Sequence, residues 1–333
     1  MPHVVESLRV VPLRAEVRKT SQIGAEVILP PSMKHLDFGG LSDDEKATLR
    51  SGLFDNGVLV VRNQQGLDPN VMPQIGRFFD ETAWHMDAPL YERLPGFVTS
   101  LHSLKNPALP DQKLQFPSGE VMPISAGATA FYSGARAFEL LSAEEKEFAL
   151  NTTVQYAPRA YEWILNCKAT DDGMTIARSG QEKKLEDLPE WSWDKVHAFP
   201  RLGKTRNSAD NFHFAQMVWR NHGNGKPHLQ VLGCCVYALH TTDPATGEVT
   251  VTDDLDEVRG ICHKLTREVY TPENIYAHRW QEGDLVIFHN RGVLHSITGE
   301  LSRPSGDSDP EKRLFWQCTM ASGTAPVAYQ AAG

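Results

Sequence analysis

The chain has 333 residues and a formal net charge of −9 at pH 7, with 42 acidic and 33 basic residues. This composition is that of an ordinary globular protein, which excludes collagen-like and wholly disordered chains. The excess of acidic residues provides no overall positive field to attract phosphate groups, so neither nucleic acid nor an anionic membrane is expected as a partner.

The cysteines indicate a reducing compartment. There are five of them, an odd number, and no CxxC motif, so neither a disulfide framework nor a zinc knuckle is predicted. The first residues, MPHVVESLRVVPLRAE, lack the continuous apolar stretch of a signal peptide, and no run approaches the roughly 18 apolar residues of a membrane helix. We therefore expect a cytoplasmic protein that does not enter a membrane.

Two helices are predicted from capping boxes. Ser42 and Glu45 open the first helix, which should end at the turn signal of Asn56 and Gly57. The segment VLVVRNQ that follows is predicted to be a strand, and its continuous apolar run indicates burial on both faces. Ser142 and Glu145 have the same capping-box spacing and open a second helix.

The second half of the chain is rich in strand signals. Apolar residues at helical spacing between 255 and 269 predict a third helix. The predicted strands are GFVTSLHSL, ATAFYSG, HLQVLGCCVYALHTT, GDLVIFH, GVLHSIT and RLFWQCTM. They are too scattered for βαβ units, and the nucleotide-binding patterns GxGxxG and GxxxxGK[ST] are absent. We expect a single domain over residues 1–322 and a C-terminal tail over residues 323–333.

A short motif in the first third of the chain has the spacing of a metal site. His85 and Asp87 in WHMD would project from the same face of an extended strand. His295 lies on a predicted strand far downstream, after a tight turn. Two imidazoles and one carboxylate form the facial triad of non-haem Fe(II) oxygenases, which leaves positions open for a co-substrate and O₂.

The His-x-Asp spacing has limited specificity. With 13 His and 42 acidic residues, about one or two His-x-acid triplets are expected by chance. His35 and Asp37 have the same spacing, but they precede a helix cap among Gly and Pro residues, so the pair at 85–87 is preferred. The other interpretation is that His85 is a surface residue and that His295 is a core histidine with satisfied hydrogen bonds.

A basic residue opens the last predicted strand. In RLFWQCTM, period-two alternation places Arg313, Phe315, Gln317 and Thr319 on one face. An inward guanidinium would need a carboxylate partner, which a dicarboxylate co-substrate could supply. Alternatively, Arg313 ends the strand in solvent.

The sequence resembles a known family, the taurine dioxygenase-like Fe(II)/2-oxoglutarate oxygenases, and within it the fungal branch that contains the xanthine dioxygenases. The resemblance covers about nine tenths of the chain, in family order. The matching stretches are IGAEV, NGVLVVRNQ, WHMDAPLYERLPGFVTSL, GATAFYSGARAFELLS, YAPRAYEW, HRWQEGDLVIFHNRGVLHSIT and RLFWQC.

The resemblance implies roles for individual residues. It makes His85, Asp87 and His295 the iron ligands. Arg313 would pair with the distal carboxylate of 2-oxoglutarate, and the Thr129 hydroxyl would hydrogen-bond to the same co-substrate. The implied fold is mainly β with flanking helices around a double-stranded β-helix, a jelly-roll or cupin-like core.

The implied activity is hydroxylation of a small polar substrate, such as xanthine or another heterocycle. Its cofactors would be Fe(II), 2-oxoglutarate and O₂, and succinate and CO₂ would be released. Gln317 and Thr319 are candidate substrate contacts. The xanthine enzymes have Asn at the second of these positions, so one amide that would contact a purine is missing.

Two further hypotheses remain at this stage. Only residues 65–84 separate Gln64 from His85, a shorter segment than is usual in the family, which favours a catalytically degenerate member that binds a small molecule or a partner. A metal-dependent hydrolase would need a general base that the sequence does not identify. Tyr156, Tyr161 and Trp163 could line the mouth of a pocket, although such aromatic residues more often pack in a core.

Overall fold

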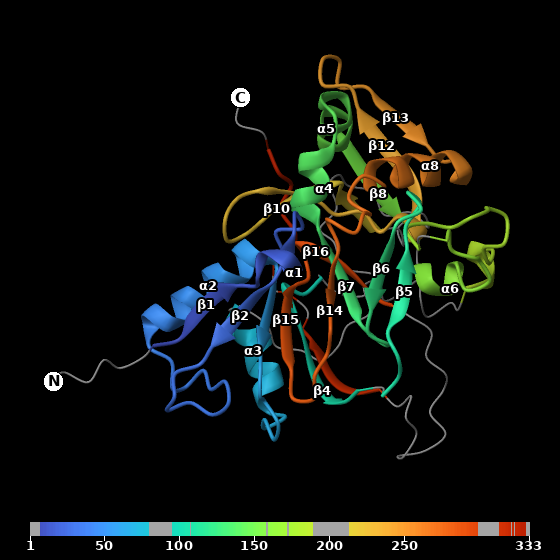
Figure 1. Ribbon diagram of the computed structural model, residues 1–333. Coiled ribbons are helices and arrows are strands. Elements are labelled where there is room, and N and C mark those ends of the chain that lie inside the picture. Colours follow the sequence, from blue (N-terminus) through green and yellow to red (C-terminus); the bar gives the residue numbers. More distant parts are fainter. Residues whose placement is uncertain are drawn as a thin grey trace.

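The protein is mainly β, with helices on the outside of its sheets (Figure 1). The computed structural model describes residues 7–79, 95–106, 108–157, 159–171, 173–188, 213–298, 313–320, 322 and 324–330. Within these ranges, no helix has the length and apolar character needed to cross a membrane.

The largest sheet has six strands drawn from both ends of the chain. In spatial order these are β1 (Arg9–Pro12), β2 (Ala25–Ile28), β3 (Val58–Val61), β15 (Leu285–His289), β4 (Val98–Lys105) and β17 (Leu314–Thr319). β2 and β3 are parallel, and the other neighbours are antiparallel. The C-terminal strand thus lies beside β4, more than 200 residues before it.

Both faces of the centre of this sheet are buried, as the apolar run VLVV predicts. Val58 and Val60 belong to one apolar cluster, whereas Leu59 and Val61 belong to another on the opposite face. The helices α2 (Asp43–Asn56) and α3 (Val71–Phe79) cover this second face. Alternation along the strand therefore supplies two cores at once.

A three-stranded sheet packs against the other face. It has the order β14 (Tyr276–His278), β7 (Thr129–Ser133) and β16 (Val293–Ile297). Phe131 of β7 and Tyr276 of β14 meet Val286 and Phe288 of β15 in the cluster between the two sheets. The candidate site residues lie at the edge of this cluster.

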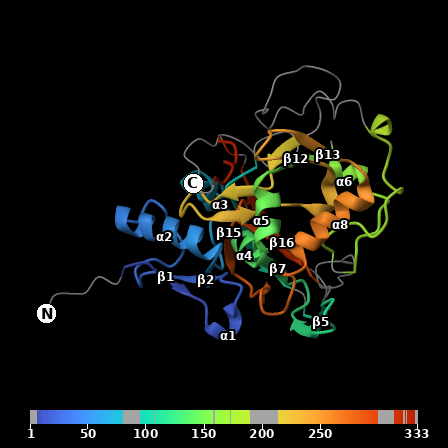
Figure 2. The same cartoon turned by 90° about the horizontal axis from the view of Figure 1, so that it is seen from above.

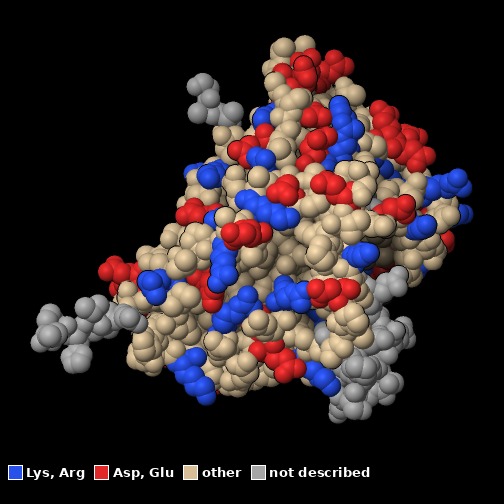
Figure 3. All heavy atoms as spheres, in the orientation of Figure 1, with Lys and Arg blue, Asp and Glu red and all other residues tan. Residues whose placement is uncertain are grey.

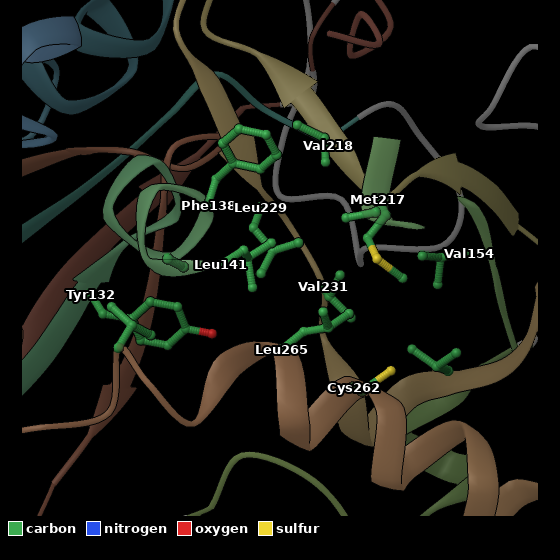
Figure 4. Close-up of a cluster of buried hydrophobic side chains, with 14 of the residues drawn as sticks. Tyr132, Phe138, Leu141, Val154, Met217, Val218, Leu229, Val231, Cys262 and Leu265 are labelled. Carbon is green, nitrogen blue, oxygen red and sulfur yellow. The ribbon is translucent and has the colours of Figure 1, made fainter. Parts of the chain in front are cut away.

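A second core surrounds a four-stranded sheet of order β13 (Val249–Thr252), β12 (Val236–Thr242), β8 (Thr152–Tyr156) and β9 (His213–Gln216). Figure 4 shows this core, where Cys262 and Leu265 of α8 (Leu255–Thr266) point toward Val154, Met217 and Val231. The helices α4 (Gly134–Leu140) and α5 (Ala143–Leu150) lie at the same end of the molecule as α8 (Figure 1), and α5 lies beside α8 in the view from above (Figure 2).

The smaller elements complete the described fold. They are α1 (Ala15–Arg18), β5 (Gln112–Gln115), β6 (Val121–Ile124), α6 (Ala160–Trp163), η1 (Leu185–Asp187), β10 (Val218–Arg220), β11 (Pro227–Leu229) and η2 (Gly233–Cys235). β5 pairs with β6, and β10 pairs with β11. The C-terminal residues also pair with β10, because Ala328 forms a β-bridge with Trp219.

The helix predictions are confirmed. The side chains of Ser42 and Ser142 each accept a hydrogen bond from the backbone N–H of the Glu three residues on, and the carboxylate of each Glu accepts one from the backbone N–H of its Ser. The third predicted helix is α8. Its N-cap is Asp254, whose side chain accepts from the N–H of Glu257.

One strand prediction is wrong. The segment HLQVLGCCVYALHTT is not one strand, because the 3₁₀ turn η2 separates β11 from β12. β11 pairs with β10, whereas β12 pairs with β8 and β13. A Cβ atom on Gly233 would lie 3.0 Å from the carbonyl oxygen of Met174, so this close approach favours glycine where the chain changes partners.

Candidate active site

His295 lies on β16 between the two packed sheets and a cavity. It pairs with Phe131 of β7, and its imidazole lies 4.7 Å from the ring of Phe288 and 6.0 Å from that of Phe131, between ring centroids. Partial desolvation by these neighbours lowers the pKa of His295. A neutral imidazole, the form that binds metal ions, is therefore favoured at neutral pH.

The turn before His295 is fixed by close backbone packing. A Cβ atom on Gly292 would lie 2.3 Å from Nδ1 of His289 and 2.7 Å from Cε1 of His228, so only glycine fits without displacing these buried rings. The neighbouring Arg291 donates two hydrogen bonds to the carbonyl oxygen of Pro95 and stacks on Phe97. These contacts set the direction in which β16 leaves the turn.

Arg313 and Thr129 lie together. Nη2 of Arg313 donates to Oγ1 of Thr129 at 3.4 Å, and its Nε donates to the carbonyl oxygen of Gly127 at 3.2 Å. The guanidinium carbon lies 3.8 Å from the centroid of the Phe315 ring, and burial lowers the pKa of Arg313. Arg313 is half-buried against these residues, and no carboxylate among the described residues forms an ion pair with it.

Trp280 extends this arrangement and was not predicted. Its indole Nε1–H donates to Oγ1 of Thr129 at 3.1 Å, and its ring meets that of Phe315 edge to face at 4.6 Å. Its other neighbour is the buried imidazole of His278, with ring centroids 4.6 Å apart. Trp280 stands in the stretch HRWQEGD, but its partner Thr129 is 151 residues away, so no local pattern reveals the contact.

A cavity of about 240 Å³ opens beside His295. Its wall contains Tyr156 and Tyr161, as one of the two interpretations expected, whereas Trp163 is buried in an apolar cluster against which Tyr156 packs, as the other interpretation expected. The polar members of the wall include Gln230 and Asn290, which are joined by a 3.3 Å hydrogen bond from Nε2 of Gln230 to the Asn290 carbonyl oxygen. The cavity combines aromatic surface with amide groups, as is typical of sites for small polar molecules.

Gln317 and Thr319 share the face of β17 that carries Phe315. Gln317 pairs with Leu101 of the cluster between the sheets, and its side chain is exposed. The hydroxyl of Thr319 lies 2.9 Å from that of Thr99, which pairs with Phe288, the ring packed on His295. Both therefore lie on the sheet face that carries Leu101 and Phe288, and neither is among the residues that line the cavity.

The structure thus brings together Thr129, Arg313 and the strand of His295. His85 and Asp87 lie outside the described residues, so their role stays a prediction. The competing pair is engaged locally: the His35 Nε2 lies 2.9 Å from the carbonyl oxygen of Gln65, and Asp37 accepts from the N–H of Gly39. No cluster of three His, Cys, Asp or Glu residues able to hold a metal occurs among the described residues.

Comparison with known proteins identifies the family. Residues 72–319 match the family described as "Taurine catabolism dioxygenase TauD, TfdA family". The chain belongs to this family. The resemblance found in the sequence is thereby confirmed, as is the class of activity that it implies, a 2-oxoglutarate-dependent dioxygenase.

This member of the TauD, TfdA family is similar to several fungal enzymes. It is 31% identical to the alpha-ketoglutarate-dependent xanthine dioxygenase xanA of Emericella nidulans, over 92% of this chain and 99% of that one. It is 38% identical to the corresponding xan1 of Schizosaccharomyces pombe, over 76% of this chain and 55% of that one.

Solved structures share the fold at low identity. A taurine dioxygenase from Burkholderia xenovorans superimposes with a TM-score of 0.55 and 15% identity, covering 97% of this chain and 93% of that one. The protein AAD-2, solved with Mn(II) and N-oxalylglycine, gives a TM-score of 0.59 and 15% identity, covering 96% of this chain and all of the other.

Proposed function

We propose that this protein is an Fe(II)- and 2-oxoglutarate-dependent dioxygenase that hydroxylates a small planar heterocycle of the xanthine type. The observation that carries the proposal is the contact of Arg313 with Thr129 on β7, the strand that also pairs with His295 of β16. We further propose that the two packed sheets form a jelly-roll core, with the site at its mouth.

The donor chemistry of the chain fits both groups. A neutral imidazole at His295, joined by His85 and Asp87, would form the facial set of ligands that leaves open positions on Fe(II). A guanidinium and a hydroxyl at Arg313 and Thr129 fit the distal carboxylate of 2-oxoglutarate, because both can donate to its oxygens. When bound, Fe(II) and 2-oxoglutarate would supply the activation of O₂, with release of succinate and CO₂.

The residues of the chain would bind and orient the co-substrate and would exclude water from the site. Arg313 would neutralise the distal carboxylate, while Thr129 would fix its rotation. The rings of Phe131 and Phe288 beside His295 would keep bulk water from this side of the site.

The cavity favours a planar polar substrate. Tyr156, Tyr161 and Trp219 offer aromatic surface, and Gln230 and Asn290 offer amide groups within the same wall. Such a wall suits a flat ring that carries both hydrogen-bond donors and acceptors. The activity printed for the fungal relatives, xanthine dioxygenation, agrees with this chemistry.

The domain organisation, the cellular location and the kind of partner of the protein are also proposed. A single domain over residues 1–322 and a cytoplasmic location remain proposals, the latter supported by the lack of any disulfide among the five cysteines. The face in Figure 3 has Lys and Arg interspersed with Asp and Glu, with no broad basic area among the coloured residues. This face therefore lacks the basic stripe that is typical of a nucleic-acid-binding surface.

The decisive experiment measures succinate release with Fe(II), 2-oxoglutarate and a panel of purines, beginning with xanthine and including amino acids as comparators. We expect succinate above background with at least one purine and only in the presence of O₂. Succinate at background with every compound, despite iron binding, would identify a degenerate member that only binds its ligand. Consumption of a purine that persists without O₂ and without release of succinate would instead favour a metal-dependent hydrolase.

A further inference from the structure

Trp280 contacts both halves of the proposed carboxylate site. Its indole N–H donates to Thr129, and its ring packs edge to face with that of Phe315, on which the Arg313 guanidinium lies. Trp280 is buried, with 8% of its surface exposed, so it is shielded from bulk solvent on most sides. One side chain therefore supports two residues that come from separate strands.

The hydrogen bonds on Thr129 determine which way its hydroxyl can act. A threonine hydroxyl has one proton to donate and two lone pairs that accept. The Trp280 Nε1–H and the Arg313 Nη2–H occupy both lone pairs. The proton of Thr129 is consequently left for an acceptor, and a carboxylate oxygen is an acceptor that carries no competing hydrogen.

Trp280 itself packs against a buried series of hydrogen-bonded side chains. The His278 imidazole packs perpendicular to the indole, at an interplanar angle of 87°. Its Nδ1 lies 2.7 Å from the Tyr276 hydroxyl, and its Nε2 lies 3.1 Å from Oδ2 of Asp284, which also pairs with Arg62.

The donors and acceptors in this series of hydrogen bonds can be assigned in one consistent way. Burial lowers the pKa of His278, which favours the neutral form of the ring. The carboxylate of Asp284 requires a donor, which places the proton on Nε2 and leaves Nδ1 to accept from the Tyr276 O–H. Burial acts to raise the pKa of Asp284, but hydrogen bonds from His278 and from the backbone of Gln281 lower it below its ordinary value. Tyr276, His278 and Asp284 each have a hydrogen-bond partner, and the ring of Trp280 packs on the central member of this series, His278.

We propose that Trp280 is a positioning residue for the co-substrate, one that commits the Thr129 hydroxyl to donate to the distal carboxylate and seats Arg313 through Phe315. This inference rests on the proposed function, because it takes the ligand of Arg313 and Thr129 to be 2-oxoglutarate. It assigns no contact between Trp280 and the co-substrate.

The test compares two keto acids that differ only at the distal end. The dissociation constants of 2-oxoglutarate and of 2-oxopentanoate, which has no distal carboxylate, are measured by calorimetry with Mn(II) in place of Fe(II). Trp280→Phe removes the N–H but keeps an aromatic ring beside Phe315. We expect it to raise the dissociation constant of 2-oxoglutarate about tenfold and to change that of 2-oxopentanoate less than twofold.

Two controls isolate the effect. Trp316→Phe shortens a tryptophan on the opposite face of β17 and should leave both constants unchanged. In a Thr129→Val background, Trp280→Phe should have little further effect on 2-oxoglutarate, because the group through which it acts is already gone. If Trp280→Phe does not fold, a bicyclic analogue with sulfur in place of the indole N–H, introduced at residue 280, serves the same purpose.

The outcomes separate this inference from the proposed function. If Arg313→Gln weakens 2-oxoglutarate but Trp280→Phe does not, the positioning role is wrong and the carboxylate site stands. Equal weakening of both keto acids by Trp280→Phe would show a general structural defect and would also overturn the inference. If Arg313→Gln leaves 2-oxoglutarate binding intact, the site assignment itself fails and the inference falls with it.

Discussion

The Thr129 hydroxyl lies 3.4 Å from Nη2 of Arg313, although 184 residues separate them in the chain. Neither strand that carries them is paired with the other, because β7 belongs to the three-stranded sheet and Arg313 leads into β17 of the six-stranded sheet. The contact therefore depends on how the two sheets face each other across the cluster of Phe131 and Phe288. Packing of the core is what assembles this part of the site.

Replacement of Arg313 is expected to weaken co-substrate binding in proportion to the lost geometry. Arg313→Lys keeps the charge but not the planar fork, so the KM for 2-oxoglutarate should rise about tenfold, while Arg313→Gln should raise it about a hundredfold. Succinate release at varied 2-oxoglutarate measures both. Arg267→Gln, which removes an exposed arginine beside Glu268, is the matched control and should change neither constant.

The two His-x-Asp pairs can be told apart by spectroscopy. Anaerobic Fe(II) with 2-oxoglutarate should give the weak visible charge-transfer band of the chelate in the unmodified protein. His85→Ala and His295→Ala should abolish the band, whereas His35→Ala should retain it, because His35 is engaged with the Gln65 carbonyl. A band that survives in His85→Ala and disappears in His35→Ala would reverse the ligand assignment.

Acid should destabilise the protein through its buried histidines. Burial lowers the pKa of His228 to about 4 from 6.5, so the unfolded chain binds a proton before the folded one does. The stabilisation is complete above pH 6.5 and is lost as the pH falls toward 4. Urea unfolding at pH 7 and pH 4.5 should show the contribution of His228 as a loss of about 2–3 kcal/mol.

The comparison for this pH effect is His228→Gln. Its absolute stability is expected to be lower at pH 7, but the fall in its free energy of unfolding between the two pH values should be smaller than in the unmodified protein. Equal falls would mean that His228 does not titrate differently in the folded and unfolded states.

The capping box of α2 should contribute measurably to stability. Ser42→Ala removes the side-chain acceptor for the N–H of Glu45 and should lower the free energy of unfolding by about 1 kcal/mol. Ser51→Ala changes an exposed serine within the same helix and should be close to neutral. Urea denaturation of both variants, with activity per folded molecule unchanged, would confirm that the effect is local to the helix terminus.

Gln317 is expected to act on the substrate rather than on the co-substrate. Gln317→Ala should raise the KM for the purine that is turned over about three- to tenfold, the range for one neutral hydrogen bond, with the KM for 2-oxoglutarate unchanged. Gln115→Ala, on an exposed position of β5, is the control. A change in the 2-oxoglutarate constant alone would place Gln317 at the other end of the site.

The local features of the fold were predictable from the sequence, and the long-range contacts were not. Ser42 and Ser142 predict the starts of their helices because a capping box involves only four consecutive residues. VLVV predicts a strand with two buried faces because the apolar run is also local in the sequence. The support of Thr129 by Trp280 joins residues 151 positions apart, and no periodicity records such a distance. The family resemblance supplied Thr129 and Arg313, and the structure supplied the tryptophan between them.

The C-terminal residues have a practical bearing on how the protein is handled. The N–H of Arg220 donates to the Val327 carbonyl oxygen, that of Tyr329 donates to Val218, and Arg291 donates to the carbonyl oxygen of Thr324. Trp219, bridged to Ala328, forms part of the cavity wall. Deleting residues 324–330 would therefore disturb the wall of the cavity in which the substrate is proposed to lie.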